Sequence, residues 1–219
     1  MLSNLDMAVL VRSLPFLWNG MLLTLQLTAM AVAGGMFLGL VLAVMRLSAI
    51  RPLAWLVAAY VNFLRSMPLI LVIFWFYTLV PKITGRPVSG FDSVLIAFIM
   101  FEAAYYSEII RAGISSIRRG QITAAMALGL TNIQAMRYVV LPQALRNMAP
   151  VLLTQSIVMF QDTSLVYVVG LRDFLTSAGI VASRDNRPIE MYLTVALVFL
   201  VICFSASRLV NLLRRRYTL

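Results

Sequence analysis

The stretch RRGQITAAMALGLTNIQAMRYVVLPQALRNMAP, residues 118–150, is the core of the longest polar connection between apolar tracts in this chain. Its alanine-rich run, residues 121–128, favours a short helix, and Gly129 is a typical residue for ending one. Thr131 or Asn132 can then cap a second helix, which we expect Pro142 to limit. The whole connection, residues 111–149, is therefore predicted to be a helix, a turn and a second helix.

The tracts around this connection are long enough to cross a membrane. About 20 apolar residues are needed for one helical crossing. Arg65, Ser66 and Pro68 interrupt the second tract, and the proline predicts a kink or break near Ser66. The pattern predicts an all-α, polytopic membrane protein with five transmembrane helices. They are expected at residues 20–45, 53–80, 91–110, 150–170 and 191–213.

Composition excludes several classes of function. Apolar residues make up 62% of the 219 positions and charged residues 12%, which is too much apolar surface for a small domain to hide from water. The net charge is +10, but the basic residues flank the apolar tracts and are not interleaved with aromatic residues. We therefore expect no nucleic-acid partner. The chain has no histidine and one cysteine, Cys203, which excludes His-dependent catalysis and disulfide or Cys/His metal sites within one chain.

The arginines and the single lysine also predict sidedness. Of the 18 basic residues, 11 fall in the connections on one side of the predicted spans and 6 on the other. The richer side is expected to be cytoplasmic. Residues 1–19 are then predicted to be an extracytoplasmic segment, residues 20–213 the membrane domain and residues 214–219 a cytoplasmic basic tail. The connections 82–92 and 171–190 would be outward-facing loops.

Three ionisable residues, Arg65, Glu102 and Asp162, lie within the predicted spans. Charged groups there cost about 2.5–3.5 kcal/mol on insertion scales, so each is a candidate for function. A structural alternative is equally open for two of them: Arg65 and Asp162 neutralise one another, or they satisfy backbone groups exposed at the Pro68 break.

The connection resembles the EAA loop of permease subunits of bacterial ABC importers. Thr123, Ala124 and Ala125 occupy the Glu-Ala-Ala positions, with Thr123 in place of the glutamate. Gly129 follows at the seventh position, and Val139, Leu141 and Pro142 match the hydrophobic-x-Leu-Pro ending.

Other stretches are similar to elements of the polar amino acid uptake family and lie in the same order. FLRSMPLILVIFW (63–75), AAYYSEIIRAGISSI (103–117) and QDTSLVYVVG (161–170) carry the likeness. Gln161, with the following LRDFLTSAGIVASRDNRPIEMYLTV, is most like permeases of glutamate/aspartate importers. The resemblance implies a type-1 ABC importer permease fold and a helix, the coupling helix, that docks in a groove of an ATPase.

The resemblance also implies partners and sites. The expected partners are an ABC ATPase dimer, a second homologous or identical permease subunit, an extracytoplasmic solute-binding protein, the amino-acid substrate and the inner-membrane bilayer. The chain itself is expected to bind no cofactor and to be no enzyme, because it lacks a phosphate-binding loop; ATP and Mg belong to the ATPase. An ion-gradient-driven transporter is the alternative, which predicts two repeated halves.

The resemblance implies two sets of site residues. Expected ATPase-coupling residues are Thr123, Ala124, Ala125, Ala127, Leu128, Gly129, Leu141 and Pro142. Expected pathway residues are Arg65, Gln161, Asp162, Thr163 and Ser164.

Overall fold

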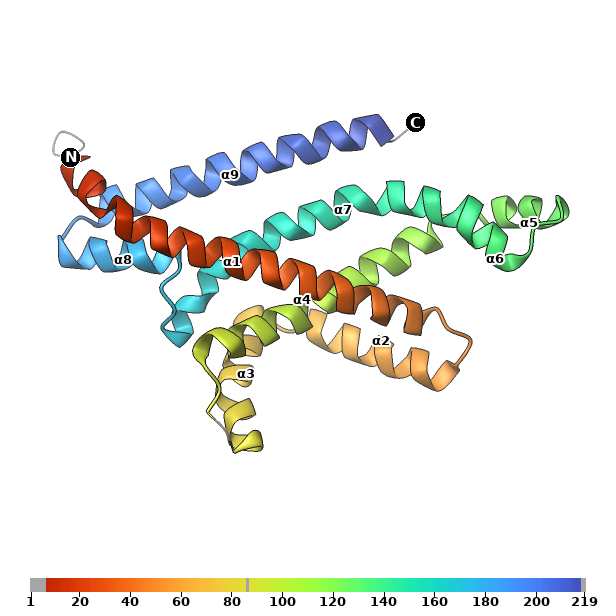
Figure 1. The fold of residues 1–219 in the computed structure, drawn as a ribbon, viewed down its shortest axis with the longest axis horizontal. Coiled ribbons are helices and arrows are strands. Elements are labelled where there is room, and N and C mark those ends of the chain that lie inside the picture. The colour runs from red at the N-terminus through yellow and green to blue at the C-terminus, as the bar shows by residue number, and fades with distance from the viewer. Residues whose placement is uncertain (1–6, 86, 218–219) are drawn as a thin grey trace.

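The computed structural model describes residues 7–85 and 87–217, and throughout this part of the chain the regular structure is helical (Figure 1). The predicted all-α class is confirmed. The elements are α1 (Met7–Arg46), α2 (Arg51–Arg65), α3 (Leu69–Thr84), α4 (Gly90–Ser115), α5 (Arg119–Ala127), α6 (Asn132–Ala135), the π-helical η2 (Met136–Val140), α7 (Leu141–Asp162), the 3₁₀ η3 (Thr163–Val169), α8 (Phe174–Arg184) and α9 (Pro188–Tyr217).

Four helical segments are long and apolar enough to cross a membrane, and α2 with α3 makes a fifth if the bent pair counts as one span. The second predicted span is thus two helices, which meet at an angle of 106°. Pro68 sits at the N-terminal cap of α3, where its missing N–H costs no helical hydrogen bond. Ser66 donates its hydroxyl to the Asn62 carbonyl at 2.8 Å and covers the last turn of α2. The predicted break near Ser66 is confirmed.

The core forms where α1 crosses α4. Two glycines of α1 permit this close approach. A Cβ added to Gly35 would lie 2.6 Å from the Glu102 Cβ, and one added to Gly39 would lie 2.7 Å from the Tyr106 Cβ. Small residues at a crossing let membrane helices pack closely without a hydrophobic driving force between them. The α1 glycines are therefore packing residues, and they fix α1 against the polar seam of α4 described below.

One boundary predicted from the sequence is wrong. Pro142 does not limit the second helix of the connection, because helical backbone continues from Asn132 through Val169. The π-helical turn η2 precedes the proline, with the Leu141 N–H bonded to the Met136 carbonyl five residues back. A wider turn of this kind relieves the clash that a proline ring makes with the carbonyl four residues earlier.

The predicted outward loop 171–190 contains a helix, α8, which the length criterion for spans did not detect. The Asp173 carboxylate caps it and accepts hydrogen bonds from the backbone N–H groups of Leu175 (3.1 Å) and Thr176 (3.0 Å). Phe174, Ala178 and Val181 are buried on one face of α8. Burial raises the pKa of the Asp173 carboxyl, which is fully covered between α1 and α8.

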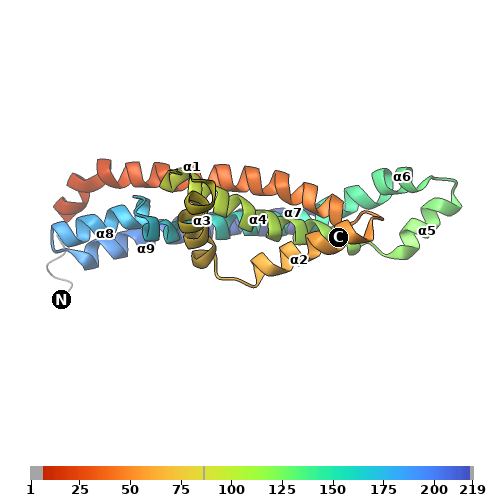
Figure 2. The same ribbon diagram turned by 90° about the horizontal axis from the view of Figure 1, so that it is seen from below.

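The molecule is elongated, with different elements at its two ends (Figures 1 and 2). One end holds the start of α1, with α8 beside it. The other holds the α1–α2 turn and, projecting beyond it, α5 and α6. Helix α1 begins at Met7, so the predicted boundary at residue 20 falls inside a helix; residues 1–6 lie outside the described part.

Candidate functional site

The projecting end is a helical hairpin whose turn is closed by backbone hydrogen bonds. Helix α5 ends in the pattern of a Schellman motif: the Gly129 N–H donates to the Met126 carbonyl at 3.0 Å, and the Leu130 N–H donates to the Ala125 carbonyl at 3.2 Å. Gly129 has φ +86°, a left-handed conformation that favours glycine. The role predicted for Gly129 as a helix stop is confirmed.

The second helix of the hairpin begins with a reciprocal cap. The Gln134 N–H donates to the Thr131 hydroxyl at 3.3 Å, and the Thr131 N–H donates to the Gln134 side-chain oxygen at 2.9 Å. This arrangement satisfies two backbone donors that a helix start leaves open. Thr131, and not Asn132, is the capping residue. The hairpin therefore keeps its shape through local bonds and needs few contacts with the rest of the chain.

The surface of this hairpin is unusually apolar for an exposed segment. Leu128 is 85% exposed and Ile133 80% exposed. Of the predicted coupling residues, Thr123, Ala124, Ala127, Leu128, Gly129, Leu141 and Pro142 are all exposed. Ala125 is only 4% exposed and packs inward, so it does not belong to the outer face on which we expected it.

Sequence reasoning missed part of this exposed surface. Ile133, Tyr138 and Met126 are apolar and exposed but match no position of the motif that guided the prediction. Large exposed apolar residues gathered at one end of a molecule mark a contact surface. The signal was present in the sequence as apolar residues spaced along the second helix, but their exposed face is defined only once the hairpin closes.

The second predicted site, the Gln161–Ser164 element, lies where α7 passes into η3. Thr163 is fully buried and donates its hydroxyl to the Phe160 carbonyl at 2.7 Å. Ser164 likewise donates to the Gln161 carbonyl at 2.8 Å. Both hydroxyls are used to stabilise the tightened backbone and keep only acceptor lone pairs for other groups. Gln161 is exposed, and Asp162 and Ser164 are half-buried, so these three carry the accessible polar atoms of the element.

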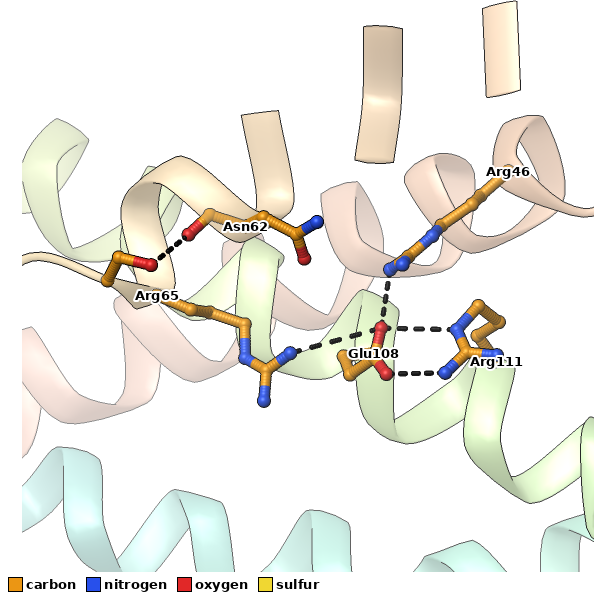
Figure 3. A network of polar contacts seen from close by, with 6 residues as sticks. Arg46, Asn62, Arg65, Glu108 and Arg111 are labelled. Carbon is orange, nitrogen blue, oxygen red and sulfur yellow. Dashed lines mark hydrogen bonds and ion pairs between the residues drawn. The ribbon is translucent and has the colours of Figure 1, made fainter. Parts of the chain in front are cut away.

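Arg65 is not paired with Asp162 in the described part of the chain, so the neutralisation alternative is wrong. Its guanidinium lies 3.9 Å from Glu108 of α4 (Figure 3). It also lies 5.4 Å from the centre of the Tyr105 ring. The carbonyls at the break are satisfied by Ser66 and Met67, not by Arg65.

Glu108 is the centre of a cluster that joins three helices (Figure 3). Arg111 binds both of its oxygens, at 3.1 and 2.5 Å, and Arg46 of α1 forms a further ion pair with it. Glu108 and Arg111 are three residues apart on one helix, whereas Arg46 and Arg65 are distant from Glu108 in sequence, and their place in the cluster was not predicted. Three guanidiniums around one carboxylate leave a net charge of +2, and Arg65 is the member held most loosely.

A second polar seam joins α4 to α7. The Gln155 amide donates to Glu102 at 3.0 Å, and the hydroxyls of Tyr106 and Ser156 are 3.0 Å apart. Glu102 is fully buried, and its other oxygen has no hydrogen-bond partner among the described residues. Gln155 was not predicted from the sequence, although a lone amide in an apolar tract is a signal of this kind of bridge.

Comparison with known proteins yields three findings. The family model described as "Binding-protein-dependent transport system inner membrane component" matches residues 35–219. The glutamate/aspartate import permease protein GltK of Escherichia coli is 52% identical over 96% of this chain and 97% of that protein, and a probable glutamine ABC transporter permease protein of Bacillus subtilis is 35% identical over 97% and 98%. A solved amino acid ABC transporter chain superimposes with a TM-score of 0.91 at 34% identity, covering 97% of this chain and 99% of that one.

Proposed function

Because the chain belongs to the family of binding-protein-dependent transport system inner membrane components, we propose that it is the permease subunit of an ATP-driven importer for glutamate and aspartate. Members of this family are transport subunits and not enzymes. The observation that supports the substrate is the likeness to the Escherichia coli glutamate/aspartate permease along nearly the whole of both chains. The alternative of an ion-gradient-driven transporter gains no support from the comparisons.

The hairpin formed by α5 and α6 is the proposed ATPase-docking element. Its exposed Leu128 and Ile133 supply an apolar contact surface, and its capped, self-contained backbone can transmit force as a near-rigid body. Under this proposal the hairpin and the C-terminus face the cytoplasm and the N-terminus faces out. A second permease subunit, an ATPase dimer that binds ATP and Mg, and an extracytoplasmic solute-binding protein complete the importer.

Cysteine cross-linking tests the docking proposal with a matched control. In a Cys203→Ser background, Ala127→Cys places a thiol on the exposed face of α5, whereas Ala125→Cys places one on its buried face. We expect Ala127→Cys to form a disulfide with a single cysteine in the ATPase groove, in a yield that changes with ATP. Equal yields from both positions, or none from Ala127→Cys in an intact complex, would contradict the proposal.

Arg65 and the Gln161–Ser164 element are proposed to contact the anionic substrate. A guanidinium binds carboxylates strongly, and Arg65, at 3.9 Å, can leave Glu108 without stranding it because Arg46 and Arg111 remain. We expect Arg65→Gln to lower ATP-driven uptake of labelled glutamate in proteoliposomes at unchanged thermal stability. Arg111→Gln, which removes the two-point ion pair, should instead lower stability. A loss of stability in Arg65→Gln equal to that in Arg111→Gln would assign Arg65 a structural role only.

A further inference from the structure

A groove with two chemically distinct parts lies between α7 and α9. Its wider part, a cavity of about 510 Å³, is lined by polar and basic residues that include Arg146, Asn147, Asn211 and Arg214. A second cavity of about 240 Å³ adjoins it and shares Val210 as a wall. The two cavities therefore form one groove. The wider cavity is its basic mouth, and the smaller cavity is a second part that differs in polarity.

The described lining of the basic mouth is free of acidic residues. Among the residues that the structure describes, no aspartate or glutamate lines either cavity. The sequence has no acidic residue at all from 109 to 161 or from 191 to 219. Arg146 is exposed and contacts no carboxylate in the part of the chain that the structure describes. Because Arg146 has no carboxylate partner there, its guanidinium is suited to binding an anion, unlike the guanidiniums grouped around Glu108.

The second cavity is apolar. Leu153, Ile157, Phe160, Ile202 and Cys203 line it. Ser156 also lines it, but its hydroxyl is already engaged with the Tyr106 hydroxyl and the Leu152 carbonyl. A cavity with such walls and no polar group left to satisfy favours a hydrocarbon occupant over water.

The basic mouth and the apolar part follow one another along the helices in the same order as the headgroup and the acyl chains of a membrane lipid. Cys203, in the wall of the apolar part, precedes Arg214, in the wall of the basic mouth, by eleven positions, which is about 16 Å along α9 at 1.5 Å per residue. Both α7 and α9 belong to candidate membrane spans. The basic mouth lies toward the end of α9, at headgroup level, and the apolar part lies deeper, at the level of the acyl chains.

We propose that this groove binds one anionic phospholipid, with its phosphate at Arg146 and Arg214 and an acyl chain in the apolar part. This inference rests on the proposed function only for the choice of leaflet. Because the C-terminus is proposed to face the cytoplasm, the lipid belongs to the inner leaflet. A free phosphate or nucleotide shares the headgroup chemistry but makes no use of the apolar part. A helix of a second permease subunit would use the apolar part but has no need of the anion site.

Native mass spectrometry of the assembled importer, stripped of lipid and titrated with dioleoylphosphatidylglycerol or dioleoylphosphatidylcholine, tests the proposal. We expect one phosphatidylglycerol per permease chain to bind with clear preference. Arg146→Gln should weaken its binding about fivefold, since one arginine near an anionic headgroup contributes about that factor. Arg51→Gln, on an exposed arginine that does not line the groove, is the control and should leave binding unchanged.

A second pair of variants distinguishes a lipid from a free anion. Ala206→Trp fills the apolar part while keeping every charge, and Ser207→Trp adds the same bulk at the next position, outside the groove. We expect Ala206→Trp to abolish the bound lipid and Ser207→Trp to retain it. Binding that survives Ala206→Trp would identify a free-anion site, and equal binding of phosphatidylcholine or no effect of Arg146→Gln would overturn the anion site. None of these readouts depends on transport, so failure here leaves the proposed function standing.

Discussion

Two short helical segments at opposite ends of the molecule turn their apolar residues in opposite directions. Helix α8 turns its apolar face inward, where Phe174 and Ala178 are buried against α1 and α9. The α5–α6 hairpin turns its largest apolar residues, Leu128 and Ile133, outward. Side chains cap the start of α8 and the start of α6, so these local bonds do not distinguish the two segments. The difference lies in what covers them: α8 is covered by its own chain, whereas the hairpin has an apolar surface that this chain leaves open.

The largest effect should come from truncating one apolar residue at each end. Phe174→Ala removes a buried ring whose centre lies 6.1 Å from the centre of the Phe199 ring. We expect this change to lower the free energy of unfolding by about 3–5 kcal/mol. Leu128→Ala should leave stability unchanged and lower ATP-driven glutamate uptake several-fold, because it removes contact surface with the ATPase. Thermal unfolding in detergent and uptake by proteoliposomes measure the two effects. A destabilised Leu128→Ala would mean that this surface is covered within the chain.

Two glycine substitutions should have opposite signs. A Cβ on Gly20 would lie 2.5 Å from the Ser177 hydroxyl and 2.7 Å from the Asp173 carbonyl oxygen, whereas one on Gly120 meets nothing within 4 Å. We expect Gly20→Ala to destabilise by about 1–3 kcal/mol through overpacking of α1 against α8. Gly120→Ala should stabilise by up to about 1 kcal/mol through helix propensity. The same measurement of thermal midpoints serves both; a Gly20→Ala protein as stable as wild type would show that α8 can yield.

How much of this contrast the sequence predicts depends on how far apart the interacting residues are in the sequence. The hairpin was predicted because glycine and threonine act on neighbouring backbone, and the break near Ser66 because a proline does. Helix α8 was missed because 11 residues cannot span a bilayer, although its buried residues follow helical spacing. The inward turn of Ala125 depends on α6 and η2 folding back on α5, and the pairing of Arg65 with Glu108 depends on two helices far apart in sequence. No local pattern encodes such contacts.

The cap of α8 offers a smaller effect that depends on pH. Asp173→Ala removes an acceptor of two backbone N–H groups and should cost about 1–2 kcal/mol. Burial raises the pKa of Asp173 in the folded protein, so folding favours the neutral carboxyl. The contribution of Asp173 to stability should therefore decline as the pH rises from 3.8, the ordinary pKa of the carboxyl, through the raised pKa. Asp173→Asn keeps a neutral acceptor, so the difference in stability between wild type and this variant should shrink toward low pH. A difference that grows on acidification would reverse the assigned sign.

The smallest expected effect tests whether the hairpin is stabilised only locally. Thr131→Ala removes the side chain that caps α6 and should cost about 1 kcal/mol, comparable with other N-caps. Since the hairpin projects beyond the packed helices, this loss should appear as faster amide hydrogen exchange in residues 128–138 while the global thermal midpoint stays the same. Asn132→Ala, next to the cap but not part of it, is the control. Faster exchange in α8 or α4 after Thr131→Ala would mean that the two ends of the molecule are coupled, and the hairpin would then transmit motion without an ATPase bound.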